Sequence, residues 1–299
     1  MTDDTTPGSR AAALDLIEAV LRRRILLDEA IDANLALRAL EPRDRAFARL
    51  LAATVLRRLG QVDAVLAQVL TRPELPKPAV QDILRLGAAQ LLFLGTPAHA
   101  AVDTAVDLVA RRGQEPYRGL VNAVLRRIAR DAAALTAGQD AARLDTPDWL
   151  WRSWSAAYGE PAARAIAEAN LNEAPLDITA RDDPAAWAGP LEAVVLPTGT
   201  LRRRTSGPVT ELPGFAEGAW WVQDAAAAMP ARLLGDVAGR TVYDLCAAPG
   251  GKAAQLAAAG ARVTAVDRSA KRLERVAANL ARLGLDARLV AADAAAWQP

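Results

Sequence analysis

The sequence DLCAAPGGKAAQL, at residues 244–256, decides how the last part of this chain folds. Its glycines follow an apolar run typical of a strand and precede an alanine-rich run typical of a helix. A second helix is expected between Ser269, as its cap, and Gly284, as its stop. The full pattern predicts strands and helices in alternation, at residues 241–245, 253–259, 262–266, 270–283 and 288–292. This β-α-β-α-β order is typical of one half of a doubly wound parallel sheet.

Residues 1–135 predict a compact all-α bundle with short loops, because their apolar side chains recur every three or four positions. Pro42 and Pro78 stand where the first turn of a helix tolerates proline. Gly60 is interpreted as the glycine that ends the helix begun at Pro42. The stretch 131–145 is interpreted as a linker.

Residues 146–222 predict a small α+β unit, rich in tryptophan and proline. Two short apolar runs, at 176–179 and 193–196, are typical of strands bounded by turns. We expect the tryptophans to be packing anchors, with stacking on nucleic-acid bases as the alternative. The fold class is therefore multidomain α and α/β. It comprises a helical domain at 1–135, a middle α+β unit at 146–222 and an incomplete Rossmann-like sheet at 223–299.

The composition excludes several classes of protein. Of the 299 residues 52% are hydrophobic and 24% are charged, which is typical of a globular chain. No run approaches the ~20 apolar residues of a membrane span, and the polar N-terminus does not resemble a secretory signal. A single cysteine excludes an internal disulfide and favours a reducing cytoplasm, and with one histidine it makes a zinc site implausible. We expect a cytoplasmic monomer without metal.

The charge is unevenly distributed along the chain. The net charge is +1 overall, but residues 1–130 carry 19 Lys and Arg against 15 Asp and Glu. Their arginines are clustered, which is typical of a phosphate-binding face, but solvated helix ends would give the same pattern. The clusters are at residues 22–24, 57–58, 111–112 and 126–130.

The glycine loop fails the tests for two nucleotide motifs. A Walker A loop needs glycine where Cys246 stands and Ser or Thr where Ala253 stands. A dinucleotide fingerprint needs G-x-G-x-x-G, which residues 248–251 do not supply. The loop is therefore expected to bind something other than a triphosphate or a dinucleotide.

Three aspartates lie at the ends of the three predicted strands. Asp267 can accept hydrogen bonds from a ribose diol, and Asp293 can accept from an adenine amino group. Asp244 lies beside the glycine loop, where it suits a cationic group. Each aspartate taken alone is better explained by a cap or a solvated loop residue. Together they would repel a pyrophosphate, and they suit S-adenosyl-L-methionine, which has a ribose, an adenine, a sulfonium and an ammonium group.

The residues of the loop carry a family resemblance. DLCAAPGGK, at 244–252, resembles motif I of the RNA cytosine-C5 methyltransferases of the Nop2/Sun/RsmB family, and Val222-Gln223-Asp224 resembles the segment preceding it. The N-terminal part resembles the NusB-like RNA-binding domain of the branch that modifies bacterial 16S ribosomal RNA. That second likeness rests on RDRAF at 43–47, LRLGAAQLL at 84–92, PAHAAV at 97–102 and GLVNAVLRR at 119–127.

The resemblance covers nearly the whole chain and implies both an activity and a site. The implied activity is S-adenosylmethionine-dependent methylation of C5 of a cytosine in 16S ribosomal RNA. The resemblance implies that Asp267 contacts the ribose and that Asp293 lies near the adenine. It also implies that the methionine part is lined by Cys246, Ala247, Ala248, Pro249, Gly250, Gly251 and Lys252.

Methylation at C5 of cytosine needs a nucleophile that Cys246 does not supply. A thiolate must add to C6, so that C5 can take the methyl group, and a base must then remove the C5 proton so that the thiolate leaves. The resemblance places that cysteine downstream, in a Thr-Cys motif, with a second cysteine after Asp-Ala-Pro. We interpret Cys246 as a packing residue or part of the cofactor side.

The chain is therefore expected to carry no catalytic residue and to be a fragment with little methyl transfer of its own, because its nucleophile would lie beyond residue 299. The alternative is a NusB-like RNA-binding module with an inert methyltransferase remnant.

Overall fold

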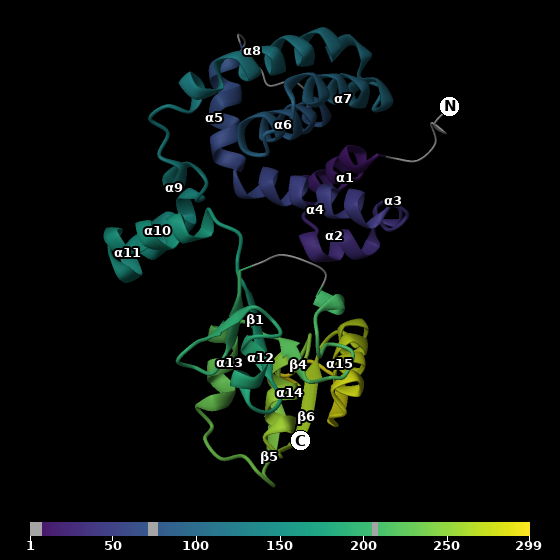
Figure 1. Ribbon diagram of the computed structural model, residues 1–299, viewed down its shortest axis with the longest axis vertical. Helices are drawn as coiled ribbons and strands as arrows, with labels where there is room; N and C mark the ends of the chain where they lie inside the picture. The colour runs from purple at the N-terminus through teal and green to yellow at the C-terminus, as the bar shows by residue number, and fades with distance from the viewer. Residues whose placement is uncertain (1–7, 71–76, 205–208) are drawn as a thin grey trace. The chain divides into compact units, whose positions relative to one another are not determined.

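The computed structural model describes residues 8–70, 77–204 and 209–299 and divides into two compact units (Figure 1). The first is Met1–Glu173 and the second is Ala174–Pro299. The three domains expected from the sequence, 1–135, 146–222 and 223–299, do not share this boundary, and that division stays a prediction. No helix in the described parts is both long and apolar enough to cross a membrane.

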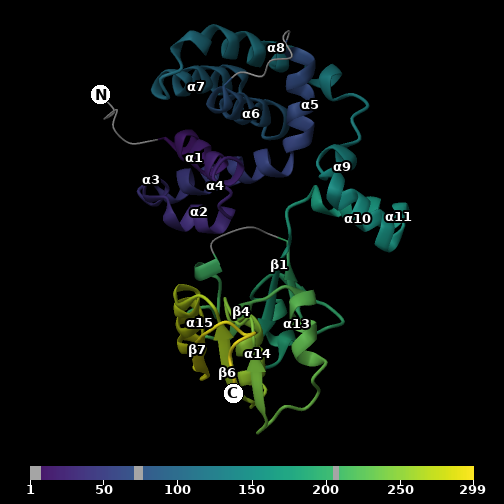
Figure 2. The same ribbon diagram turned by 180° about the vertical axis from the view of Figure 1, so that it is seen from behind.

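The first unit is helical throughout its described residues. Helix α6 lies at its centre and contacts five other helices, α1, α4, α5, α7 and α8 (Figure 2). Gly87 of α6 allows a close approach to α8, since a Cβ there would stand 2.5 Å from Leu125 Cδ1 of that helix. The elements are α1 (Ser9–Leu21), α2 (Leu27–Ala33), α3 (Leu35–Arg38), α4 (Pro42–Arg57), α5 (Leu59–Val69), α6 (Pro78–Phe93), α7 (Ala98–Arg111), η1 (Glu115–Tyr117), α8 (Arg118–Thr136), α9 (Ala141–Leu144), α10 (Asp148–Tyr158) and α11 (Glu160–Asn170).

Two features of this unit correct the sequence analysis. Gly60 does not end α4 but lies inside α5, and a Cβ there would stand 1.8 Å from the carbonyl oxygen of Leu144. The glycine is therefore needed for a close contact between α5 and the end of α9, not for a turn. The supposed linker at 131–145 is largely helical, because α8 continues to Thr136 and α9 follows it. The helix starts expected at Pro42 and Pro78 are confirmed.

The second unit begins with a small antiparallel sheet in the order β2-β3-β1-β4. Its core consists of Ile178, Leu191, Leu201 and Trp220, none of which is exposed to solvent. Residue Ile178 of β1 pairs with Leu201 of β3 and with Val222 of β4, which fixes the register. The elements are β1 (Leu176–Ala180), α12 (Pro184–Ala188), β2 (Ala193–Val195), β3 (Leu201–Arg203), η2 (Val209–Glu211) and β4 (Trp220–Val222).

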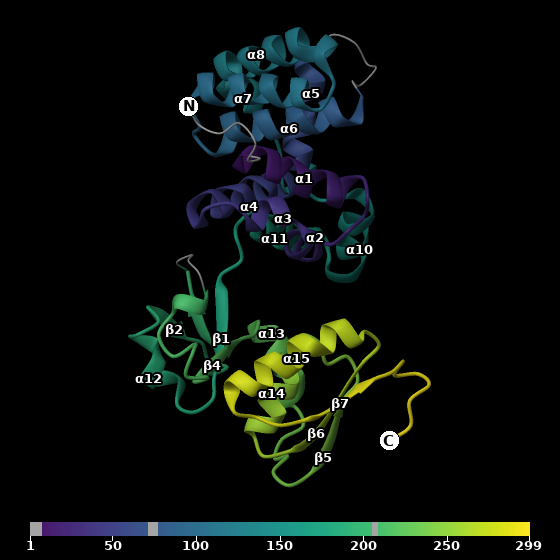
Figure 3. The same ribbon diagram turned by 90° about the vertical axis from the view of Figure 1, so that its right-hand side faces the viewer.

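A parallel sheet in the order β5-β6-β7 follows, as the sequence predicts. Helices α14 and α15 pack on one face of it (Figure 3) and share a core with β6 that includes Leu256, Val263 and Val276. Both ends of α15 are as expected, since Ser269 accepts a hydrogen bond from Arg272 N and Gly284 is left-handed with φ 62°. The elements are α13 (Ala225–Arg232), β5 (Thr241–Asp244), α14 (Gly251–Ala258), β6 (Arg262–Asp267), α15 (Ala270–Leu283) and β7 (Arg288–Ala291).

Two arginines form hydrogen bonds between the small sheet and the parallel-sheet part of this unit. Arg181, just after β1, donates to the carbonyl oxygen of Leu283 at 2.8 Å. Arg282 of α15 donates to the carbonyl oxygens of Phe215 at 2.6 Å and Trp220 at 3.1 Å. Arg181 of the small sheet and Arg282 of α15 thus bind backbone carbonyl oxygens of each other's part of the unit, and the two sheets form one packed body.

Candidate functional site

Three aspartates gather at the carboxyl edge of the parallel sheet. Asp244 pairs with Ala265, two residues before Asp267, and Asp267 pairs with Ala291, two residues before Asp293. The three carboxylates are therefore staggered by two residues from each strand to the next. This edge is where open α/β sheets bind their ligands.

The loop between β5 and α14 is held by backbone contacts on both sides. The N–H of Ala247 donates to the carbonyl oxygen of Val266 at 3.0 Å, and the N–H of Ala248 donates to Asp267 Oδ2 at 3.2 Å. Ala247 is 4% exposed and belongs to the core of the unit. The Ala248–Pro249 peptide is cis. The hydrogen bonds of Ala247 and Ala248 give the loop a fixed path from one strand end to the next.

Helix α15 also binds this loop through two side chains seven residues apart. Arg272 donates to the carbonyl oxygen of Ala248 at 3.2 Å, and Asn279 donates to that of Pro249 at 3.0 Å. Neither residue stands out in the sequence as a candidate for the site. Their seven-residue spacing on one helical face was the only available signal, and it does not reveal what that face contacts.

Gly250 closes the loop in a conformation that only glycine adopts freely. Its φ is 109°, and a Cβ there would stand 3.2 Å from Val276 Cγ1. Gly251 follows as the first residue of α14, and Lys252 is half-buried next to it. The result is a bare backbone surface at the start of a helix, beside the end of β5.

Asp244 is the most unusual group at this edge. Its residue is only 8% exposed, and its Oδ2 has no hydrogen-bond partner among the described residues. Its Oδ1 accepts a long hydrogen bond, 3.4 Å, from Cys246 N. Burial raises the pKa of this carboxyl, although Lys252 and backbone N–H groups oppose the rise. An unsatisfied buried carboxylate costs stability, so its retention suits a cationic ligand.

Asp267 and Asp293 differ in burial. Asp267 is 5% exposed, and its two oxygens accept from Ala248 N and from Ser269 N at 3.0 Å. Each carboxylate oxygen can accept a second hydrogen bond, so Asp267 retains capacity for a diol. Asp293 is exposed just after β7, and its Oδ1 accepts from Ala295 N at 2.9 Å. The predicted roles of both stay predictions.

Cys246 is exposed, which corrects one of its two interpretations. A packing residue would be buried, whereas this thiol lies at the surface of the loop between Asp244 and Ala247. The interpretation that remains is a place on the cofactor side. The described residues contain no cluster of His, Cys, Asp and Glu able to hold a metal ion.

The first unit has a basic groove of about 470 Å³ between α7 and α8. Its cationic lining is Arg126 and Arg130, with His99 beside them and alanines and Val102 around them. Among the residues that the structure describes, no acid lines the groove. Asp131 lies next to it and binds Arg130 at 2.9 Å. His99 is exposed here and is not a core residue.

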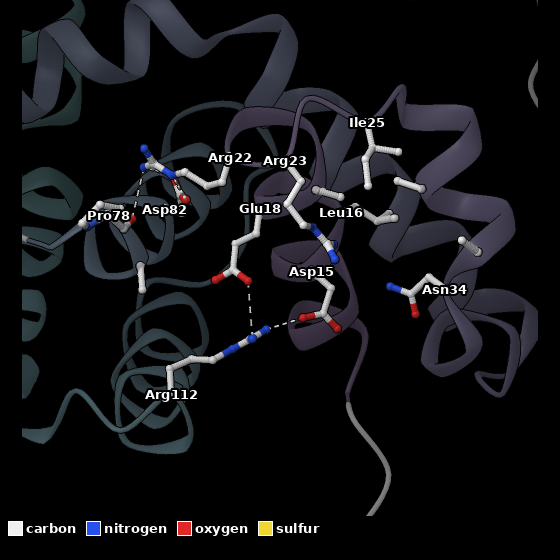
Figure 4. A pocket seen from close by; sticks show the side chains of 14 residues that line it. Asp15, Leu16, Glu18, Arg22, Arg23, Ile25, Asn34, Pro78, Asp82 and Arg112 are labelled. Atoms are coloured by element: carbon white, nitrogen blue, oxygen red, sulfur yellow. Dashed lines mark hydrogen bonds and ion pairs between the residues drawn. The ribbon is translucent and has the colours of Figure 1, made fainter.

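A larger pocket of about 680 Å³ lies near the end of α1 (Figure 4). Its three acids each bind an arginine: Arg22 binds Asp82, and Arg112 binds Asp15 and Glu18. This internal pairing leaves the pocket without a preferred sign of charge. We therefore regard its lining as part of the fold.

Comparison with known proteins identifies both ends of the chain. The NusB family matches residues 7–130, and the family described as 16S rRNA methyltransferase RsmB/F matches residues 231–298. Ribosomal RNA small subunit methyltransferase B of Xanthomonas campestris is 36% identical over 97% of this chain and 69% of its own length. A probable enzyme of that name from Synechocystis is 34% identical over 93% of this chain and 67% of its own length.

This chain belongs to the ribosomal RNA small subunit methyltransferase B family. It spans about two thirds of the length of the relatives named above. Among solved structures, PH0851 has a TM-score of 0.68 at 19% identity, covering 98% of this chain and 71% of its own, which supports the fold alone. Family membership confirms the resemblance stated for the loop and the helical domain.

Proposed function

We propose that this chain binds S-adenosyl-L-methionine at the β5–α14 loop and 16S ribosomal RNA through its basic surfaces, for methylation of C5 of a cytosine. The observation that carries the proposal is the buried Asp244 carboxylate with its unpartnered Oδ2 at the mouth of a glycine-lined loop. S-adenosylmethionine supplies a methyl group on a sulfonium. The names of the relatives support the RNA substrate.

We assign a separate role in binding the donor to each residue at the carboxyl edge of the parallel sheet. Asp244 would hold the ammonium group of the donor, since a desolvated carboxylate binds a cation more strongly than a solvated one. Gly250 and Gly251 would let the backbone approach the methionine part, which Cys246 to Lys252 would line. Asp267 would accept from the ribose and Asp293 would lie near the adenine.

Cys246 would not attack the cytosine. Its backbone N–H binds Asp244 within the donor loop, so the thiol belongs to the donor side of the reaction and not to the base. It is the only cysteine of the sequence, and C5 methylation needs a thiolate at C6. We therefore propose that residues 1–299 bind donor and RNA without efficient methyl transfer. We also propose that the protein acts as a cytoplasmic monomer.

Calorimetric titration with S-adenosylhomocysteine tests the donor site. The unaltered chain should release heat with one site, and Asp244→Asn should weaken binding about tenfold, because a charge-assisted hydrogen bond is lost. The matched control is Asp286→Asn, which removes an exposed acid of the same unit and should leave affinity unchanged. Absence of heat from the unaltered, folded chain would overturn the donor proposal.

The alternative, an RNA-binding module with an inert methyltransferase remnant, is favoured by the basic groove on α7 and α8. Arg126 and Arg130 would contact RNA phosphates there, so charge reversal of both should lower RNA affinity and its salt dependence. Charge reversal of Arg43 and Arg49, two exposed arginines of α4, is the control. RNA binding together with no binding of S-adenosylhomocysteine would favour this alternative over the first proposal.

A further inference from the structure

Gln223 is a buried amide that joins four elements of the second unit. It follows β4 directly and is only 5% exposed. Its Oε1 accepts from Thr179 Oγ1 of β1 at 2.9 Å and from Trp221 Nε1 of β4 at 3.0 Å. Its Nε2 donates to Gln255 Oε1 of α14 at 3.0 Å, and Gln255 Nε2 donates to the carbonyl oxygen of Ala228 in α13 at 3.1 Å.

The direction of this chain of hydrogen bonds is fixed by Trp221. An indole N–H only donates, so the oxygen of Gln223 must face it and the nitrogen must face Gln255. The oxygen of Gln255 must then face Gln223, which leaves its nitrogen for Ala228. Neither amide can turn over without losing a bond, and a buried amide that loses a bond is costly.

Gln223 also touches the beginning of the donor-loop helix. A Cβ on Gly251 would stand 3.5 Å from Gln223 Cγ, and Gln255 lies one turn further along the same face of α14. The side chain of Gln223 therefore lies along the first turn of α14, on the side of the small sheet. Helix α14, which follows the loop ending in Gly250, therefore begins against the side chain of Gln223.

We propose that Gln223 is a positioning residue for the donor site, and this rests on the proposed function. Its amide holds the first turn of α14 against β1 and β4, so that the loop at 246–250 keeps the shape in which it receives the donor. Gln223 thereby links the small sheet directly to the helix that follows the donor loop. Gln223 itself need not touch the donor.

The decisive variant is Gln223→Glu, tested by calorimetry with S-adenosylhomocysteine. Glutamate keeps the shape and still accepts from Thr179 and Trp221, but its second oxygen faces Gln255 Oε1. Either the link to α14 is lost or, if the Gln255 amide turns over, the bond from Gln255 to Ala228 is lost, so the chain of hydrogen bonds is broken in both cases. We expect affinity to fall about tenfold. Adding Gln255→Lys provides a donor opposite the new carboxylate and should restore most of the affinity, which a general loss of packing would not allow.

The matched control is Gln61→Glu in the first unit. Gln61 is 7% exposed and its Nε2 donates to Gln139 Oε1 at 3.0 Å, so the same change breaks an equivalent pair of amides. The Gln61→Glu variant should unfold at a lower urea concentration than the unaltered chain, and it should bind S-adenosylhomocysteine with the same affinity.

The outcomes separate this inference from the proposal on which it rests. If the unaltered chain binds and Gln223→Glu binds equally well, the inference is overturned and the donor site stands. If the folded, unaltered chain does not bind, both are overturned. Should Gln223→Glu fail to fold, Thr179→Val decides, since it removes only one donor to Gln223 and should weaken binding about threefold. Unchanged affinity in that variant would overturn the inference.

Discussion

Asp82 in the helical unit and Asp244 in the α/β unit are both buried carboxylates, and their surroundings are opposite. Asp82 is fully buried and accepts from Arg22 Nε and Nη2, each at 2.8 Å, and from Arg85 Nη1 at 2.9 Å. Asp244 has one long hydrogen bond and an oxygen without a partner among the described residues. The charge of Asp82 is paired with arginines of the same unit, whereas one oxygen of Asp244 remains available to a ligand.

The difference separates a structural carboxylate from one available to a ligand. Around Asp82 the desolvation cost is offset by two guanidinium groups, so the cluster contributes to folding only while it is complete. The desolvation cost of the Asp244 carboxylate is not offset in this way by a guanidinium group of the described residues. Four single substitutions, with effects on stability that differ in size and sign, test this contrast.

Asp82→Asn should have the largest effect on stability. The change removes the buried anion shared by Arg22 and Arg85, although Arg85 keeps its pair with Asp63, and it should lower the free energy of unfolding by about 3 kcal/mol. Urea denaturation measures the loss, and affinity for S-adenosylhomocysteine should not change. A loss below about 1 kcal/mol would mean that water replaces the carboxylate at no great cost.

Asp177→Asn should have the next largest effect, with a pH dependence of definite sign. Hydrogen bonds from Arg202, at 2.7 Å to each oxygen, hold the pKa of Asp177 below its usual range, despite burial. The carboxylate therefore stabilises the fold above about pH 4, and that contribution is lost as pH falls through the lowered pKa. Unfolding in urea should show a loss of about 2 kcal/mol at neutral pH, which shrinks in acid. A loss independent of pH would contradict this account.

Asp244→Asn should change stability in the opposite direction. Because burial raises the pKa of Asp244, the folded state is penalised as pH rises through that pKa, and the penalty is absent in acid, below about pH 4. The variant should be more stable than the unaltered chain by about 1 kcal/mol at neutral pH and no more stable in acid. Parallel urea titrations at the two pH values measure this. A loss of stability at neutral pH would show that Asp244 is structural.

Asp131→Asn should have the smallest effect. Asp131 binds Arg130 on the surface, and this hydrogen bond lowers the pKa of the carboxyl. Solvent screens such a pair, so the urea midpoint should not move measurably. This variant is the solvent-exposed counterpart of Asp82→Asn, and a clear shift would show that surface pairs matter more in this chain than burial predicts.

Local signals allowed the parallel sheet and its helices to be predicted. Ser269 and Gly284 mark the ends of α15 by their own chemistry, and the alternation of strand and helix does not depend on distant residues. Gly60 was misinterpreted because its reason lies 84 positions away, in the carbonyl oxygen of Leu144. A glycine that serves close packing cannot be told from a terminating glycine by its neighbours.

The candidate site was predictable in position but not in detail. The aspartates at the strand ends follow from strand boundaries, so Asp244, Asp267 and Asp293 could be placed at one edge. The unpartnered oxygen of Asp244 and the exposure of Cys246 depend on how the loop packs, which no spacing reveals. The contacts of Gln223 likewise join segments that are far apart in the sequence.

The stagger of the strand ends sets a length requirement on any ligand that engages all three carboxylates. Each step along the sheet edge moves about 7 Å forward and about 5 Å sideways, since two strand residues rise about 3.3 Å each. Asp244 and Asp293 thus stand at opposite ends of a slanted row two steps long. A free amino acid or a bare nucleobase spans one step at most. Only an extended molecule with polar groups at both ends and in the middle reaches every position at once.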